Sequence, residues 1–406
     1  MNEPHDVIPL RERNRIASID VLRGFALLGV LLMNMQAFAM VFSLYMNPTA
    51  LGQPTGLDFW CWTVNHVIGD QKFMTIFSML FGAGIFLMTE KSRDRSGRSA
   101  GLHYRRMLWL GVFGCLHGIF IWAGDILFMY AICGLLAWVF RRLWLSILIP
   151  LALILLLLPS ALLLGFDQYM ADETQEAQDL MRAMWSPSPE TVALQEGAYR
   201  GDWLAQQKER YKTWLEMFSF IILFGWRVLG LMLLGIGLFR IGLFSAAKSR
   251  GLYLFLMLIG LGSGLTLTAF GVDYQQSAGW DLVKGMGVGG LFNYFGSILA
   301  AFGYVGMVML LCRSARLPGL KRRLAAVGRM AFTNYIMHSL ICTTIFYGHG
   351  LGLFGQLNRL WQLLLVVAIC ALQLWYSPLC LERFRFGPLE WLWRSLTYMR
   401  RQPFRR

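Results

Sequence analysis

Charged residues are scarce in this sequence: they account for 15% of its 406 residues, whereas hydrophobic residues account for 56%. Soluble domains carry about 25% charged residues, because they must cover their outside with polar groups. The deficit therefore excludes an ordinary soluble domain. The apolar residues also gather into runs of roughly 20, the length that a helix needs to cross about 30 Å of hydrocarbon. These features predict an all-α, polytopic membrane helix bundle.

The sequence also lacks any cysteine or histidine spacing that is typical of a metal site. Its seven cysteines include no CxxC pair, and its six histidines are scattered. Most of the cysteines lie inside apolar runs, where they are expected to act as small packing residues. We therefore expect neither a metal site nor a disulfide framework.

Acidic residues are few, with 23 Asp and Glu against 37 Lys and Arg, and the formal net charge is +14. In a soluble protein such an excess would suggest binding to nucleic acid. Here the arginines flank apolar runs, as they do in cytoplasmic loops that follow the positive-inside rule and face anionic lipid. We therefore expect the lipid bilayer to be the partner of this charge, and we expect no nucleic acid.

The N-terminus has no evident cleavage site for a signal peptidase. Arg11, Arg13 and Arg15 precede an apolar run over residues 25–45. This run is too long for the core of a signal peptide and has no clear small-residue cleavage site. It is expected to remain as the first span.

About ten spans are predicted from the apolar runs. They lie at residues 22–43, 66–89, 104–122, 125–140, 143–164, 215–239, 251–271, 288–312, 327–347 and 359–381. Basic residues follow every even-numbered span, whereas the opposite loops are neutral or acidic. The positive-inside rule then predicts that both termini lie in the cytoplasm.

A long acidic segment divides the chain. It covers residues 165–214 and separates an N-terminal half of five spans (1–164) from a C-terminal half of five spans with a cytoplasmic tail (215–406). The segment is predicted to form amphipathic helices outside the membrane, as a solvated cap or as a lid. Small residues along several spans allow helices to approach closely, and a homodimer is one arrangement that they favour.

Two pairs of polar residues are predicted near the outer ends of spans. His117 lies late in the third span, and Asp125 follows a turn that Gly124 permits. A carboxylate that orients a histidine is typical of general-base catalysis, although a histidine on an apolar helix is also often a satisfied packing residue. His66 and Asp70 are four residues apart and can touch.

Other polar residues within the predicted spans are expected to face a cavity or a partner, because an ionisable group in lipid is costly. Asp20 and Arg23 share a helix face, and Asn34 lies about halfway through the first span. Asn334 and His338 are four residues apart and share a face of the ninth span. For each, a structural pairing between helices is the alternative to a functional role.

The order of these motifs resembles the YeiB family of bacterial inner-membrane proteins, which carries a C-terminal DUF418 region. The matching stretches are residues 18–24 (SIDVLRG), Asn34, 72–73 (KF), 80–84 (LFGAG), 117–118 (HG), 124–127 (GDIL), 328–330 (GRM), 333–335 (TNY) and 387–394 (GPLEWLWR). The resemblance implies a multi-pass protein of the bacterial inner membrane. The family is in turn similar to transmembrane acyltransferases such as the heparan-α-glucosaminide N-acetyltransferases, which take acetyl from cytoplasmic acetyl-CoA and deliver it across the membrane.

The resemblance therefore implies an acyltransferase that uses acetyl-CoA or another acyl-CoA, with a small molecule or a glycan as the acceptor. The residues expected to carry the chemistry are His117, Asp125, His66 and Asn34, and the base is left open between the two histidines. The residues expected to bind the donor are Asp20, Arg23, Lys72, Arg105, Arg329, Asn334 and His338.

Two other functions use the same residues. A transporter or exporter would place the buried polar groups along a translocation path. A non-catalytic membrane partner would need them only for stability, so that replacing His117 or Asp125 would abolish no reaction.

Overall fold

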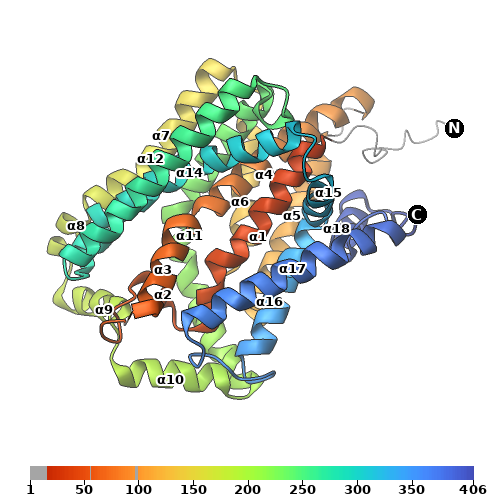
Figure 1. The fold of residues 1–406 in the computed structure, drawn as a ribbon. Helices are drawn as coiled ribbons and strands as arrows, with labels where there is room; N and C mark the ends of the chain where they lie inside the picture. Colours follow the sequence, from red (N-terminus) through yellow and green to blue (C-terminus); the bar gives the residue numbers. More distant parts are fainter. Residues whose placement is uncertain (1–15, 55, 97–98) are drawn as a thin grey trace.

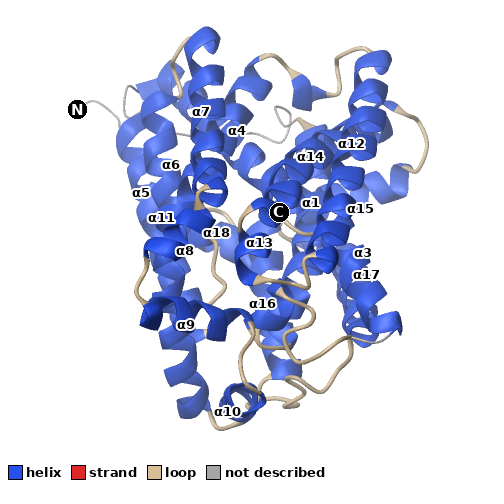
Figure 2. Cartoon of the chain, turned by 90° about the vertical axis from the view of Figure 1, so that its left-hand side faces the viewer, coloured by secondary structure: helices blue, strands red, loops and turns tan. Residues whose placement is uncertain are grey.

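The structure is a computed structural model that describes residues 16–54, 56–96 and 99–406. Apart from two isolated β-bridges, the regular structure of these residues is helical (Figure 1, Figure 2). The all-α fold expected from the sequence is therefore present across the described residues. Arg11, Arg13 and Arg15, on which the position of the N-terminus depends, lie outside them.

The described residues of the first half of the chain form seven helices. They are α1 (Ala17–Ala39), α2 (Phe42–Met46), α3 (Gly56–Ile68), α4 (Lys72–Ser96), α5 (Ser99–Phe120), α6 (Leu127–Phe140) and α7 (Leu145–Leu164). Three shorter helices follow, α8 (Phe166–Asp172), α9 (Gln175–Trp185) and α10 (Pro189–Arg200). They cover most of the acidic segment that the sequence sets apart.

The second half begins with the longest helix, α11 (Trp203–Arg240). The helices after it are η2 (Leu243–Ser245), α12 (Arg250–Ser277), α13 (Leu282–Met286), α14 (Val288–Arg313), α15 (Pro318–Arg329), α16 (Ala331–Phe346), α17 (Arg359–Arg383) and α18 (Pro388–Tyr398). Because α11 starts inside the acidic segment and continues into the next predicted span, these two parts of the chain share one helix.

Six helices of the described residues are long and apolar enough to cross a membrane. They are Ala17–Ala39, Gly56–Glu90, Leu145–Leu164, Arg250–Ser277, Leu282–Arg313 and Arg359–Arg383, where α3 joins α4 and α13 joins α14. These helices indicate a membrane protein. Helices α5, α6, α11 and α16 occupy the four other predicted positions, and α6 and α16, with 14 and 16 residues, are short for a span. Ten spans and cytoplasmic termini therefore stay predictions.

Helix α1 packs against α15 with almost no space between the two backbones. A Cβ atom on Gly24 would lie 1.9 Å from the Leu324 carbonyl oxygen, and one on Gly328 would lie 2.0 Å from the Asp20 carbonyl oxygen. Glycine at both positions lets the helices touch backbone to backbone, as small residues do in membrane proteins. This contact fixes α1 along one wall of the central cavity described below.

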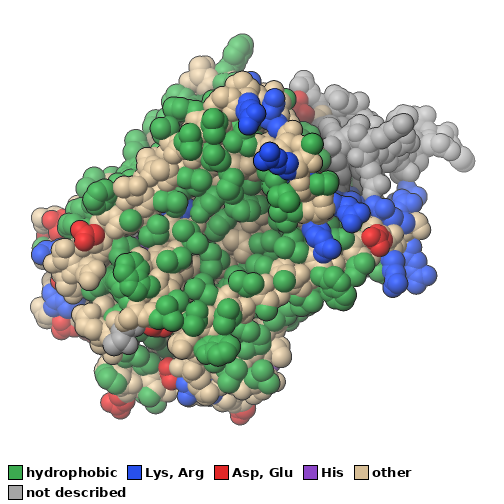
Figure 3. All heavy atoms as spheres, viewed as in Figure 1, with side chains coloured by type: hydrophobic (Ala, Val, Ile, Leu, Met, Phe, Trp, Pro, Cys, Tyr) green, Lys and Arg blue, Asp and Glu red, His purple; other side chains and the backbone are tan. Residues whose placement is uncertain are grey.

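The two ends of the bundle differ in charge. Lys and Arg side chains gather near α15 and α18, which we call the basic end, and Asp and Glu side chains gather at the opposite end, near α8 to α10, which we call the acidic end (Figure 3). The positive-inside rule predicts that the basic end faces the cytoplasm.

Two of the apolar helices are interrupted. Helix α3 stops at Ile68 and α4 starts at Lys72, and between them Gln71 adopts a positive φ of 61°. Gly287, with a φ of −74° and a ψ of −111°, separates α13 from α14. The two interrupted helices meet, since the Tyr304 hydroxyl of α14 donates to the Ile68 carbonyl oxygen at 2.8 Å. An interruption exposes backbone and side-chain polar groups that a continuous helix would hide.

Candidate functional site

One cavity of about 1230 Å³ runs between α1, α4, α6, α11 and α16. Four arginines line it at the basic end: Arg23, Arg106, Arg329 and Arg394. Glu209, Lys212 and Glu216 of α11 line it at the acidic end. The same cavity therefore reaches both ends of the bundle, and its lining changes from basic to acidic along the way.

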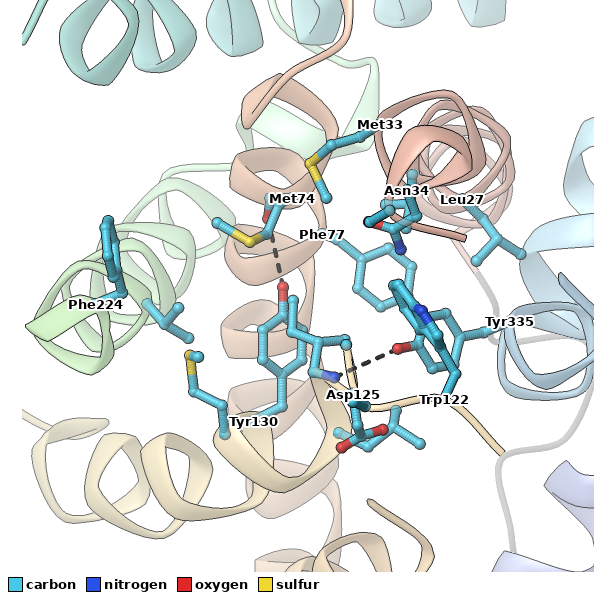
Figure 4. A pocket seen from close by; sticks show the side chains of 18 of the residues that line it. Leu27, Met33, Asn34, Met74, Phe77, Trp122, Asp125, Tyr130, Phe224 and Tyr335 are labelled. Atoms are coloured by element: carbon cyan, nitrogen blue, oxygen red, sulfur yellow. Dashed lines mark hydrogen bonds between the residues drawn. The ribbon is translucent and has the colours of Figure 1, made fainter. Parts of the chain in front are cut away.

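The middle of the cavity is mostly apolar and aromatic. Met33, Met74, Phe77 and Trp122 surround it, and Asn34 points into it from α1 (Figure 4). No hydrogen bond joins the Asn34 amide to another of the described residues. An amide inside a membrane protein is costly to leave without a partner, so this group is available for a ligand or water.

Two of the four arginines at the basic end lie over aromatic rings. The Arg106 guanidinium lies 4.4 Å from the centre of the Trp393 ring, and that of Arg394 lies 4.4 Å from the centre of the Phe386 ring. Arg23 donates to Asp20 Oδ1 at 3.1 Å. Contacts with aromatic faces position a guanidinium without neutralising its charge. The basic end is thus suited to an anion with several negative groups.

Glu390 also lines the basic end, but its carboxylate is engaged by α16. It accepts hydrogen bonds from the backbone nitrogens of Phe332 and Thr333 at 2.6 and 3.0 Å, and from the Thr333 hydroxyl at 2.6 Å. Glu390 therefore caps the N-terminus of α16. Burial raises the pKa of this carboxyl above its usual value, against the opposing effect of the Thr333 hydrogen bonds.

Arg105, which the sequence suggested for donor binding, lies outside the cavity. Its guanidinium is exposed at Nη1 and contacts the sulfur of Met399 at 3.0 Å. The next residue, Arg106, lines the cavity instead. One residue turns a helix by about 100°, so the sequence could place a basic pair here but could not tell which member faces inward.

The predicted pair of His117 and Asp125 is formed. His117 Nδ1 lies 2.7 Å from Asp125 Oδ2, and His117 Nε2 lies 2.8 Å from the Ser339 hydroxyl oxygen. The His117 and Asp125 side chains are 2% and 0% exposed, and neither His117 nor Ser339 lines the cavity. Both ring nitrogens of the histidine are therefore occupied behind the cavity wall.

Asp125 also shapes the turn between α5 and α6. Its Oδ1 accepts from the Phe128 nitrogen at 2.8 Å at the start of α6, and the Tyr335 hydroxyl accepts from the Ile126 nitrogen at 3.3 Å. A Cβ atom on Gly114 would lie 2.4 Å from the Phe128 nitrogen, so this glycine lets the two helices approach. The backbone of the turn, with Tyr335 beside it, faces the cavity (Figure 4).

A second polar cluster lies where α3 is interrupted. Asp70 Oδ1 accepts from the Tyr45 hydroxyl, Asp70 Oδ2 accepts from the Asn293 amide at 2.7 Å, and His66 Nδ1 lies 3.2 Å from the same oxygen. Lys72 is fully buried and donates to Asn293 Oδ1 at 2.7 Å. Tyr45 and Asp70 line the cavity, but Lys72 and His66 do not. The sequence suggested the contact of His66 with Asp70, whereas Tyr45 and Asn293 were not foreseen.

Arg227 of α11 is a further buried cation that sequence reasoning missed. It is 0% exposed and donates to the Gln71 side chain, to the Ser297 hydroxyl at 2.7 Å and to the Thr75 hydroxyl at 3.3 Å. The signal was present, because one arginine stands in the middle of the predicted span at 215–239. Its contacts tie α11 to the interruption between α3 and α4.

Asn334 and His338 share a helix face, as their spacing predicts, but that face lies against α17. The Asn334 amide donates to the Ser377 hydroxyl at 3.1 Å, and His338 Nε2 lies 2.8 Å from Gln373 Oε1. Both are buried and neither lines the cavity. These two residues therefore join α16 to α17 away from the cavity.

The donor set of the cavity suits phosphates better than a metal ion. Arginine forms paired, charge-assisted hydrogen bonds with phosphate oxygens, and four arginines face one region. Among the described residues, no three His, Cys, Asp or Glu side chains gather in a way that could hold a metal.

Comparison with known proteins identifies relatives along nearly the whole chain. The family model described as "Protein of unknown function (DUF418)" matches residues 238–400. The uncharacterized protein YxaH of Bacillus subtilis (strain 168) is 32% identical over 97% of each chain. The uncharacterized protein YeiB of Escherichia coli (strain K12) is 30% identical over 95% of this chain and 96% of its own. An uncharacterized 39.9 kDa protein of Bacillus acidopullulyticus is 29% identical over 97% of each chain.

Proposed function

The chain belongs to the YeiB/DUF418 family, and from this premise we propose that it is an acyltransferase that moves an acyl group from acyl-CoA at its basic end to an acceptor from its acidic end. The observation that carries the proposal is the cavity, which joins four arginines to the Asn34 amide and continues to the opposite end. Among the described residues this amide has no hydrogen-bond partner. A reaction between two substrates from opposite sides of a membrane needs such a passage.

The basic end supports binding of the donor. Arg23, Arg106, Arg329 and Arg394 would hold the phosphates of CoA. Arg23 and Asn34 are eleven residues apart on α1, which is a rise of roughly 16 Å. The extended phosphopantetheine arm of CoA has a length of this order, so its thioester would reach Asn34. The positive-inside rule predicts that this end faces the cytoplasm, where acyl-CoA is made.

Asn34 and Tyr335 are placed to stabilise the negative charge that forms on the thioester during acyl transfer. A thioester carbonyl gains negative charge when an acceptor attacks it, and preorganised donors stabilise that charge in a site that excludes water. The Asn34 amide would donate to the carbonyl oxygen, and the Tyr335 hydroxyl, which accepts from the Ile126 nitrogen, has its own proton left to donate. His117 and Asp125 would position Tyr335 and the turn at residues 121–126.

Binding of acetyl-CoA to the purified protein tests the proposal. We expect Arg106→Gln to weaken binding about tenfold or more, since a charge-assisted hydrogen bond contributes roughly 1.5–3 kcal/mol. Arg105→Gln is the matched control, because Arg105 is the neighbouring arginine outside the cavity. Calorimetric titration in detergent measures the affinity of each variant for acetyl-CoA. Absence of binding at millimolar acetyl-CoA, or equal loss in both variants, would contradict the proposal.

Transport of a small molecule is the second candidate, and the same cavity favours it. The cavity reaches both ends of the bundle and passes the interrupted helix α3–α4, a feature that transporters use to bind substrates. Reconstituted vesicles with labelled acetyl-CoA outside separate the two functions. An acyltransferase transfers the label covalently to an acceptor inside, whereas a transporter moves a solute unchanged.

The bacterial relatives and the need for cytoplasmic acyl-CoA support a place in the bacterial inner membrane. The acceptor would be a small molecule or a glycan that approaches the acidic end. The lipid bilayer would surround the apolar helices, and a homodimer stays a proposal.

A further inference from the structure

We propose that Tyr45 and Asp70, at the interruption between α3 and α4, form the acid–base centre of the transfer reaction. The Tyr45 hydroxyl would contact the acceptor, and Asp70 would take up the proton that the acceptor loses. This inference rests on the acyltransferase function proposed above and names the residues that activate its second substrate.

Access to the cavity is the first argument. Tyr45 and Asp70 both line it, and the Tyr45 hydroxyl donates to Asp70 Oδ1. A general base must come within hydrogen-bonding reach of the proton that it removes. His117 does not meet this condition, because Asp125 and Ser339 occupy both its ring nitrogens and it lies behind the cavity wall.

The position of the interruption is the second argument. The Gln71 nitrogen contacts the sulfur of Met33 at 3.4 Å, and Met33 precedes Asn34 on α1. Met33, Asn34 and Gln71 all line the cavity. The residue after Asp70 therefore contacts the residue before Asn34, so an acceptor held by Tyr45 would approach a thioester bound at the Asn34 amide.

The charges around Asp70 form the third argument. Three groups contact its carboxylate directly: Tyr45 of α2, His66 of α3 and Asn293 of α14. Lys72 of α4 and Arg227 of α11 lie one residue further away. Lys72 and Arg227 are both fully buried basic side chains that lie behind the cavity wall. Lys72 donates to Asn293, which itself donates to Asp70, and Arg227 donates to Gln71, the residue after Asp70. Basic groups near a carboxylate favour its anionic form, which is the form that accepts a proton.

The transfer step then balances. The acceptor oxygen or nitrogen forms a bond to the acyl carbon, and the bond from that carbon to sulfur breaks. The proton of the acceptor moves to the Tyr45 oxygen while the Tyr45 proton moves to Asp70. The sulfur leaves as a thiolate with the bonding electron pair. Asp70 passes its proton to His66, which lies 3.2 Å away, and His66 releases it to solvent. This proton balances the one that the thiolate takes up from solvent.

The experiment measures release of free CoA thiol from acetyl-CoA by the full-length purified protein, with water as the acceptor. We expect Tyr45→Phe and Asp70→Asn each to lower kcat roughly 100-fold or more, the contribution of a general base. KM for acetyl-CoA should stay within about twofold, because the donor contacts lie elsewhere, and Asp70→Asn should also abolish the acid limb of the pH profile.

Tyr304→Phe is the matched control. Tyr304 donates to the Ile68 carbonyl oxygen beside the same interruption but does not line the cavity. It should keep kcat, and its melting temperature reports the structural cost of losing a hydroxyl there. If the Asp70→Asn protein does not fold, the kcat of Tyr45→Phe alone tests the proposed centre.

The outcomes separate the two proposals. Wild-type protein that does not bind acetyl-CoA overturns the acyltransferase function. Wild-type protein that binds acetyl-CoA and leaves it intact for hours overturns the Tyr45–Asp70 centre alone, because a base beside the thioester would activate water. Full activity in Tyr45→Phe, or an equal loss in Tyr304→Phe, overturns it as well.

Discussion

His117 and Asp125 face each other across the turn between α5 and α6, with Nδ1 of the histidine 2.7 Å from Oδ2 of the aspartate. Ser339 of α16 completes a row of three hydrogen-bonded side chains. In an exposed site this row would resemble a nucleophile, a base and an orienting acid. Here its members are buried, and α5, α6 and α16 are joined through them.

Replacing His117 should therefore lower the free energy of unfolding without removing a group that contacts the substrates. His117→Ala leaves the buried Asp125 carboxylate without one of its partners, which costs roughly 1–3 kcal/mol or more. Ser339→Ala removes only a neutral hydroxyl at the other ring nitrogen and should cost about 1 kcal/mol. Thermal unfolding in detergent ranks the two variants. A His117→Ala protein that melts like the wild type yet has lost all turnover would instead make His117 the base.

Pairs close in sequence could be predicted, and pairs far apart could not. The spacing of His66 and Asp70 on one helix and the tight turn after His117 are local features, so the sequence carries them. Ser339 and Asn293 lie more than 200 residues from the side chains that they contact, and only the fold brings them there.

The direction in which each side chain points also could not be predicted from the sequence. The spans are apolar on nearly all sides, so they have no polar stripe that marks an inward face. The sequence predicts Arg105 as a donor-binding residue, whereas Arg106 is the one that lines the cavity. It also predicts that Asn334 and His338 share a helix face, but it does not indicate that α17 covers that face. The interruption at Gln71 was missed because no proline or paired glycine marks it.

The contact between α1 and α15 should tolerate no added methyl group. Gly328→Ala would place a Cβ atom 2.0 Å from the Asp20 carbonyl oxygen, so the two helices must move apart. Overpacking of this kind costs roughly 1–3 kcal/mol. Gly262→Ala is the control, since a Cβ atom there has no neighbour within 4 Å. A lower melting temperature for Gly328→Ala alone is expected, and equal melting temperatures would rule out the tight contact.

Glu390 should make stability depend on pH. Its folded pKa is raised by burial, so its contribution to stability is fully present below the unfolded pKa of about 4.3 and is lost as pH rises through the folded pKa. Glu390→Gln keeps an acceptor oxygen for the N-terminus of α16 but cannot ionise. Melting temperatures from pH 4 to 7 should show the wild type falling relative to the variant as pH rises. Parallel curves would mean that Glu390 does not titrate in this range.

The unbroken course of α11 has a mechanical consequence. Near its start, Arg210 donates to the Phe120 carbonyl oxygen at the end of α5, and roughly 25 Å further along the same helix Arg227 holds Gln71. A rigid rod that pivots at one end must swing at the other. A rigid tilt of α11 about its Arg210 end would therefore also move the anchor of Gln71, so entry at the acidic end and the geometry beside Asp70 would be coupled through this helix.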